Sequence, residues 1–130
     1  MAKMGHTRVP VPGASPRGAV ARLAAELADA LGPRAVLAAP ADLASYAYDA
    51  GFLEHLPDLV VLPSSAEEVA LTVRRASAAG LPMVARGSGT GLCGGAVPIQ
   101  GGVVIALTRM NQVLRLSLIH ISEPTRQAEI

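Results

Sequence analysis

Five glycines and two small hydroxyl residues lie within the ten residues from Arg86 to Gly95. Such a density is unfavourable inside a helix or strand, because glycine loses the most backbone entropy on ordering. It is useful where backbone must pass close to a ligand and present several N–H groups, as concave nests do for phosphate oxygens. The hydroxyls of Ser88 and Thr90 could add hydrogen bonds without blocking the approach. The pattern predicts an anion or nucleotide cradle, with a structural turn as the alternative.

This loop differs from the two commonest nucleotide-binding loops. A P-loop closes on Lys-Ser or Lys-Thr before a helix, and no lysine follows Lys3 in this chain. A Rossmann fingerprint needs G-x-G-x-x-G at the start of a helix. Gly87, Gly89 and Gly91 miss that spacing, and a strand rather than a helix is expected after them.

The elements that position the loop are predicted from short apolar runs. Pro57 and Pro63 bound the first run, and the glycine-rich loop separates the second from the third. With a helix between the first two runs, this order makes a βαβ unit with parallel strands. The loop then leaves the carboxyl end of the second strand, where α/β folds place ligands. The predicted strands are Leu59–Leu62, Met83–Ala85 and Gly102–Leu107.

Two helices are predicted from capping and periodicity. Ser64 and Glu67 have the spacing of a capping box, so a helix is expected over Ser65–Ala79. Ser15 and Pro16 predict the start of an earlier helix, which Gly32-Pro33 ends; a short strand at Ala35–Ala38 and a short helix or turn at Pro40–Asp49 follow. The predicted apolar stripe of the earlier helix is Val20, Leu23, Ala24, Leu27 and Leu31, and that of the later helix is Ala66, Val69, Ala70, Val73 and Ala76.

The chain from about residue 40 to 115 resembles the N-terminal FAD-binding lobe of the vanillyl-alcohol-oxidase type flavoproteins, the FAD-binding PCMH-type domain. Within that family it is most similar to the branch of glycolate oxidase large subunits and D-lactate dehydrogenases. The pattern R-G-x-G-T-G-L-x-G-G-A, which starts at Arg86, is specific to that branch. The other matching segments are Pro57–Pro63, the Ser-Ser-Ala-Glu-Glu helix start, Gly80-Leu81-Pro82 and Gly102–Ile105.

The resemblance implies an α+β fold, namely the βαβ-containing N-terminal lobe of a truncated PCMH-type FAD-binding domain. It implies FAD as cofactor, with its pyrophosphate on the N–H groups of Gly87–Gly91. The FAD is expected to be non-covalent, because Thr90 stands where covalent members carry a histidine. The implied cofactor-binding residues are Arg86, Gly87, Ser88, Gly89, Thr90, Gly91, Leu92, Gly94 and Gly95.

By the same resemblance, the parent protein is a flavin-dependent dehydrogenase or oxidase of a 2-hydroxy acid such as glycolate or D-lactate. An electron-transfer subunit is a candidate partner. The catalytic residues would lie in a missing C-terminal part, so this chain alone is expected to be inactive. Two alternatives stay open: a non-catalytic nucleotide-binding module, and a different PCMH-type flavoenzyme such as the NADPH-dependent cell-wall reductases.

Several single residues have ordinary explanations. Asp49 is expected to anchor a loop rather than to act in catalysis, and Pro63 to end a strand, with flavin contact as a further option. Cys93 is expected to be a buried small hydrophobe, and as the lone cysteine it has no disulfide partner in the chain. No pair among His6, His55 and His120 has metal-ligand spacing, so no metal site is expected.

Composition excludes other classes. The net charge of +1 comes without a basic stripe, which gives no support to nucleic-acid binding. No apolar run approaches the roughly 20 residues of a membrane span. Residues 1–18 lack the apolar core of a secretory signal. A cytoplasmic location is therefore expected.

The last residues differ in character from the rest. Leu116–Arg126 is similar to a translated transposase-based sequencing adapter, and residues 116–130 hold three isoleucines against two in residues 1–115. We therefore expect four segments: a disordered arm at 1–18, a helical segment at 19–56, a partial FAD-binding domain at 57–116, and a non-native tail at 117–130.

Overall fold

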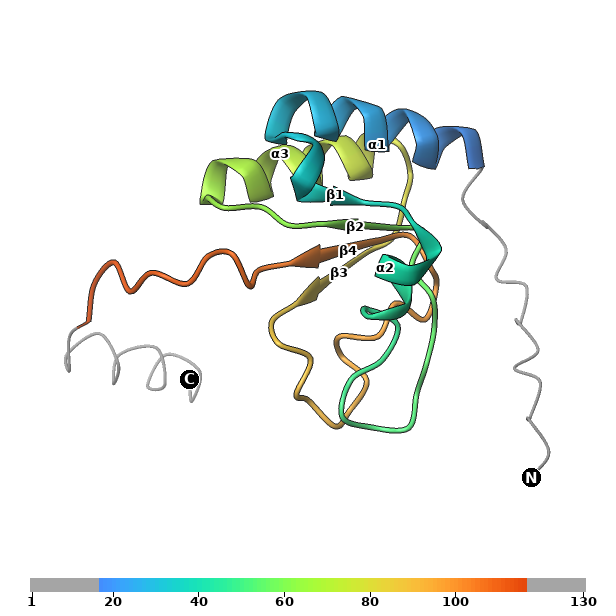
Figure 1. Cartoon of the computed structure of the whole chain (residues 1–130), viewed down its shortest axis with the longest axis vertical. Helices are drawn as coiled ribbons and strands as arrows, with labels where there is room; N and C mark the ends of the chain where they lie inside the picture. Colours follow the sequence, from blue (N-terminus) through green and yellow to red (C-terminus); the bar gives the residue numbers. More distant parts are fainter. Residues whose placement is uncertain (1–16, 117–130) are drawn as a thin grey trace, which may run out of the picture.

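The computed structural model describes residues 17–116, which form one four-stranded mixed sheet with helices on both faces (Figure 1). The strand order is β1-β2-β4-β3; β1 runs antiparallel to β2, and the other neighbours are parallel. The elements are α1 (Arg17–Leu31), a 3-10 turn (Pro33–Ala35), β1 (Val36–Leu37), α2 (Pro40–Ala44), β2 (Leu59–Val61), α3 (Ala66–Ala78), β3 (Met83–Arg86) and β4 (Val103–Ala106).

The predicted α+β class and the parallel strands are confirmed. β2, α3 and β3 form the expected strand–helix–strand unit, but β4 inserts between the two strands of that unit. Val104 of β4 pairs with Val60 of β2 on one side and with Val84 of β3 on the other. All four residues of β4 are buried, as is typical of a central parallel strand covered on both faces.

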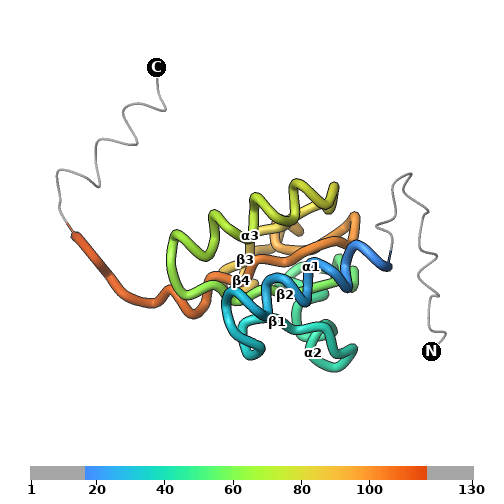
Figure 2. The backbone as a smooth tube through the Cα atoms, turned by 90° about the horizontal axis from the view of Figure 1, so that it is seen from above, coloured from blue at the N-terminus to red at the C-terminus, as the bar shows by residue number. Residues whose placement is uncertain are grey.

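The sheet separates two apolar cores. Figures 1 and 2 show α1 and α3 side by side on one face, while α2 lies on the other. The first core holds Leu23, Leu27, Leu59, Val61, Ala76, Leu81, Val103 and Ile105, and the second holds Val60, Leu62, Val104 and Ala106, flanked by Leu37, Leu43 and Tyr46. The predicted segments 19–56 and 57–116 therefore share both cores.

The capping box of α3 lies one residue later than predicted. Ser65, not Ser64, is the N-cap, and its hydroxyl accepts a hydrogen bond from the N–H of Glu68 at 3.2 Å. The carboxylate of Glu68, not that of Glu67, reaches back and accepts from the N–H of Ser64 at 2.6 Å. Two adjacent serines followed by two adjacent glutamates fit both registers, and the packing of the helix decides between them.

The buried stripe of α3 also differs from the prediction. Ala66 and Val73 are exposed, whereas Thr72 is fully buried with Ala76. Thr72 can be buried because its hydroxyl donates a hydrogen bond to the carbonyl of Glu68 at 2.8 Å. The stripe of α1 is confirmed, with Leu23 and Leu27 buried and its other three members packed against the same core.

Several predictions fall wholly or in part outside the described residues. These are the disordered arm up to residue 16, the helix start at Ser15 and Pro16, and the tail at 117–130. Within residues 17–116, no helix has the length and apolar character needed to cross a membrane.

Candidate functional site

The predicted cradle is a loop that begins at the carboxyl end of β3 and returns to the amino end of β4 (Figure 1). No described residue accepts a hydrogen bond from the backbone N–H groups of Gly87–Gly91. Four of these five residues are exposed, and Gly89 is half-buried. Exposed N–H groups without a protein acceptor bond to water, and a bound ligand can take the place of that water as the acceptor.

Arg86, the last residue of β3, lies beneath this loop and is only 7% exposed. Its guanidinium donates a hydrogen bond to the carbonyl of Tyr48, and its Cζ lies 5.5 Å from the centroid of the Tyr46 ring. Among the described residues, no ion pair includes Arg86. A buried charge without a counter-ion is costly, so an anion on the loop above would be favoured.

Gly89 shows how closely the loop lies on Arg86. Its φ is +75°, and a Cβ built on it would lie 2.5 Å from Cζ of Arg86 and closer still to Nη2. Such contacts do not occur between real atoms, so any side chain here would require the guanidinium of Arg86 to move. The predicted role of Arg86 in supporting the loop has this geometric basis.

The other half of the loop is held by Tyr46–Leu53, which we call the docking segment. Asp49, 6% exposed, accepts hydrogen bonds from the N–H of Gly51 at 2.7 Å and of Gly94 at 2.9 Å. The N–H of Ala50 donates to the carbonyl of Gly91 at 3.0 Å. The predicted anchoring role of Asp49 thus has an identified partner, which sequence reasoning did not find. No local signal could have found it, because Asp49 and Gly94 are 45 residues apart.

The remaining predicted site residues divide by exposure. The hydroxyls of Ser88 and Thr90 lie 3.5 Å apart on the exposed part of the loop. Gly94 is buried, its N–H is taken by Asp49, and its Cα faces Leu53. The loop therefore brings together Gly87, Ser88, Gly89, Thr90 and Gly91 as a surface, with Leu92 and Gly95 exposed beside them.

The burial of two neighbouring residues, Cys93 and Pro63, bears on what was expected of them. Cys93 is exposed, not buried, because this part of the loop stands away from both cores. Pro63 is fully buried at the end of β2, which leaves it no surface for contact with a flavin.

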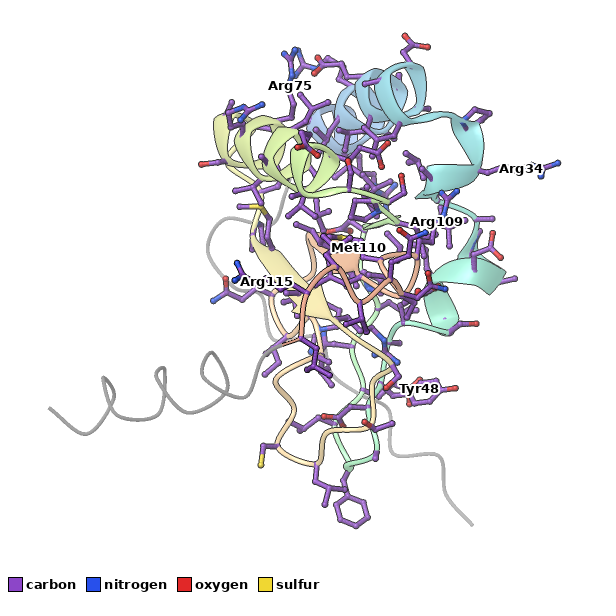
Figure 3. The ribbon with its side chains drawn as sticks, turned by 90° about the vertical axis from the view of Figure 1, so that its left-hand side faces the viewer. Arg34, Tyr48, Arg75, Arg109, Met110 and Arg115 are labelled. Carbon is purple, nitrogen blue, oxygen red and sulfur yellow. The ribbon has the colours of Figure 1, made fainter. Side chains whose placement is uncertain are left out.

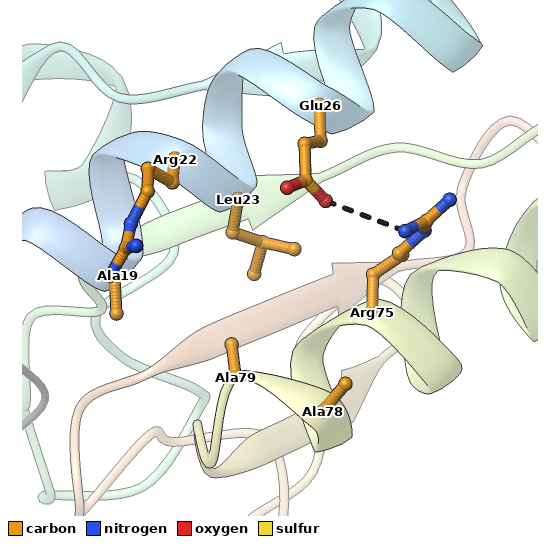
Figure 4. A pocket seen from close by; sticks show the side chains of 7 residues that line it. All are labelled: Ala19, Arg22, Leu23, Glu26, Arg75, Ala78 and Ala79. Carbon is orange, nitrogen blue, oxygen red and sulfur yellow. Dashed lines mark ion pairs between the residues drawn. The ribbon is translucent and has the colours of Figure 1, made fainter.

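The hollow between α1 and α3 is a separate feature (Figure 4). It lies on the face of the sheet that carries α1 and α3, and no residue of the glycine loop lines it. Glu26 and Arg75 form an ion pair across it at 3.8 Å, with both side chains more than half exposed. Within residues 17–116, no three histidine, cysteine or acidic side chains are grouped to hold a metal ion.

Comparison with known proteins gives a family for this chain. A family model described as "FAD binding domain" matches residues 57–126, which include the whole loop. The match runs past Leu116, so the non-native tail stays a prediction. Glycolate oxidase subunit GlcD of Bacillus subtilis (strain 168) is 40% identical over 72 residues, or 55% of this chain and 15% of that protein. A D-lactate dehydrogenase of Anaerostipes hadrus is 47% identical over 58 residues, or 45% of this chain and 12% of that protein.

Solved structures share the fold. p-Cresol methylhydroxylase matches with a TM-score of 0.71 and 23% identity, over 82% of this chain and 22% of that one. 4-Ethylphenol oxidase from Gulosibacter chungangensis matches with a TM-score of 0.69 and 24% identity, over 92% of this chain and 27% of that one. The chain thus spans between an eighth and about a quarter of the length of these relatives.

Proposed function

This chain belongs to the FAD binding domain family, and from that premise we propose that Gly87–Gly91 bind the pyrophosphate of FAD. The observation that carries the proposal is the run of N–H groups without intramolecular acceptors, lying over the buried guanidinium of Arg86. Backbone N–H groups and a positive charge are what phosphate oxygens require. The residues present therefore fit the cofactor of this family.

Each residue of the loop would have a distinct role. The N–H groups of Gly87–Gly91 would donate to phosphate oxygens, and the hydroxyls of Ser88 and Thr90 would add further donors. Arg86 would act from beneath, through its charge and by fixing the position of Gly89. Leu92, Gly94 and Gly95 would shape the second half of the loop. The FAD would be held without a covalent bond, because Thr90 offers no histidine nitrogen to the flavin.

For the whole protein we propose oxidation of a 2-hydroxy acid, of the glycolate or D-lactate type, to the 2-oxo acid. The names of the sequence relatives support this class. Bound FAD supplies the two-electron acceptor; the residues of this chain bind and orient it. The relatives named as glycolate oxidase subunits support an electron-transfer partner subunit. We further propose that the protein acts in the cytoplasm.

The cofactor site can be tested on the 130-residue chain with ADP, whose adenosine diphosphate group is also part of FAD. The ¹H–¹⁵N amide spectrum is recorded during a titration. We expect the largest shift changes at Gly87–Gly91, with weaker changes at residues of the docking segment. Changes confined to the hollow between α1 and α3, or no changes at all, would contradict the proposed site.

A matched pair of arginine variants tests the role of charge. Arg86→Met should weaken ADP binding by about tenfold or more, since one charge-assisted interaction is worth about 1.5–3 kcal/mol. Arg75→Met removes the same charge from an exposed position and should leave the affinity unchanged. Equal losses in both variants would mean that only net charge matters.

The substrate class is tested on the full-length flavoprotein without oxygen. Addition of D-lactate or glycolate should bleach the yellow flavin, and the matched L-lactate should bleach it more slowly. A protein that holds FAD but is bleached by neither D-lactate nor glycolate would belong to a different branch of the family. That result would contradict the proposed substrate class and leave the proposed cofactor site unaffected.

A further inference from the structure

We infer that Asp49 is a positioning residue for the cofactor loop. Its carboxylate fastens Gly94 to the docking segment and so holds the backbone of Gly87–Gly91, with its unpaired N–H groups, in position. This inference rests on the proposed function for the identity of the ligand, whereas the fastening itself can be measured without any ligand.

The contacts of Asp49 account for both of its oxygens. Oδ1 accepts from the N–H of Gly51 within the docking segment, and Oδ2 accepts from the N–H of Gly94 across the loop. Hydrogen bonds to a carboxylate are stronger than those between neutral groups. The loss of one acceptor oxygen would leave a buried N–H without a partner, which costs more than an ordinary hydrogen bond contributes.

The position of Gly94 is held in more than one way. Its φ is +78°, and the side chain of Leu53 lies directly against its Cα, where a Cβ would approach Cδ1 at 2.8 Å. The nearby carbonyl of Gly91 is bound by the N–H of Ala50. The loop is thus fixed at one end by Arg86 under Gly89 and at the other by Asp49 on Gly94, with the unpaired N–H groups between and beside these points.

A second hydrogen bond from a glycine N–H to an aspartate carboxylate lies elsewhere in the chain and serves as a control. Asp58 accepts a hydrogen bond from the N–H of Gly102 at 2.7 Å, and Gly102, like Gly94, has a φ of +78°. This pair spans 44 residues and lies at the amino end of β4, outside the glycine loop. Asp58→Asn therefore changes the same chemistry in the same chain at a place where no cofactor contact is proposed.

The experiment compares Asp49→Asn with Asp58→Asn in the ¹⁵N-labelled 130-residue chain. Asparagine keeps one acceptor oxygen and places an N–H₂ donor at the other position, so one backbone N–H loses its acceptor. For Asp49→Asn we expect a shift of the Gly94 amide proton, lower backbone order at Gly87–Gly91, and ADP binding weakened about tenfold. For Asp58→Asn we expect a shifted Gly102 amide and unchanged loop order and ADP affinity.

The outcomes separate this inference from the proposed function. If the wild-type chain does not bind ADP but Asp49→Asn loosens the loop, the proposed function fails and the fastening stands. If the wild type binds ADP and Asp49→Asn binds it equally well with an equally ordered loop, the positioning role is overturned.

Asp49→Ser is the second variant, because serine can still accept from the N–H of Gly51 but is too short to reach Gly94. It should reproduce the loss of loop order. If both Asp49 variants unfold while Asp58→Asn folds, Asp49 is a folding residue and the positioning role is overturned.

Discussion

The guanidinium group of Arg86 occupies the space in which a side chain at Gly89 would lie. Arg86 is held there by the carbonyl of Tyr48 and the ring of Tyr46. One residue pair therefore links the end of β3, the middle of the glycine loop and the docking segment. A loop that looks flexible in composition is packed against a buried, charged support.

This contact predicts unequal effects of alanine at two glycines. Gly89→Ala should lower the free energy of unfolding by about 1–3 kcal/mol, because a non-glycine residue with positive φ is strained and the Cβ displaces Arg86. Gly91→Ala should change it by less than about 0.5 kcal/mol, since a Cβ there meets no atom within 4 Å. Urea denaturation of both variants provides the measurement. Equal losses would show that the loop is uniformly tight.

Bulk at Gly91 should instead act on the cofactor. Gly91→Val in the full-length flavoprotein should purify with little flavin, because the side chain projects into the open space that the pyrophosphate would use. Ser88→Ala removes at most one hydrogen bond, worth about 0.5–1.5 kcal/mol, and should stay yellow. The ratio of flavin to protein absorbance measures both. If Gly91→Val retains a full complement of FAD, the pyrophosphate binds elsewhere.

The two neighbouring tyrosines should differ in importance. Tyr46→Leu should lower the free energy of unfolding by about 1–2 kcal/mol, because it removes the ring beneath Arg86 and part of the second core. Tyr48 contacts Arg86 through its backbone carbonyl and pairs with Glu54 through its backbone, while its side chain is half exposed and points outward (Figure 3). Tyr48→Leu should therefore stay within about 0.5 kcal/mol of the wild type. The unfolding temperatures of the two variants, measured under identical conditions, test this, and equal losses would contradict it.

The corrected capping box can be checked in the same way. Ser65→Ala should cost about 0.5–2 kcal/mol, the usual effect of losing an N-cap side chain. Ser64→Ala loses the exposed hydrogen bond from its hydroxyl to the Glu68 carboxylate at 2.9 Å but keeps the one from its backbone N–H, so it should cost less. A larger loss for Ser64→Ala would restore the register first expected from the sequence.

Non-covalent attachment of FAD is tested on the full-length flavoprotein. After acid denaturation and centrifugation through a filter, the yellow colour should pass into the filtrate, since Thr90 cannot bond to the flavin. A known covalent flavoprotein treated alongside serves as the control. Colour retained with the denatured protein would contradict the prediction.

Local features of the sequence were sufficient to predict the order of the elements and the loop that carries the proposed site. The apolar run between Pro57 and Pro63 and the serine–glutamate start of α3 act within a few residues, so they can be read from neighbours in sequence. The glycine density from Gly87 to Gly95 likewise indicates close backbone approach, whatever lies around it.

Only the tertiary structure decided the rest, because the deciding contacts join distant residues. The position of β4 between β2 and β3 depends on which strand edges pair. The apolar pattern of each strand would be the same if β3 paired directly with β2. Thr72 is buried with Ala76, which depends on how α3 packs on the sheet. The bond from Asp49 to Gly94 spans 45 residues, and the burial of Arg86 depends on the docking segment beneath the loop. No local pattern encodes either contact, because both form only when the fold brings the docking segment against the glycine loop and the end of β3.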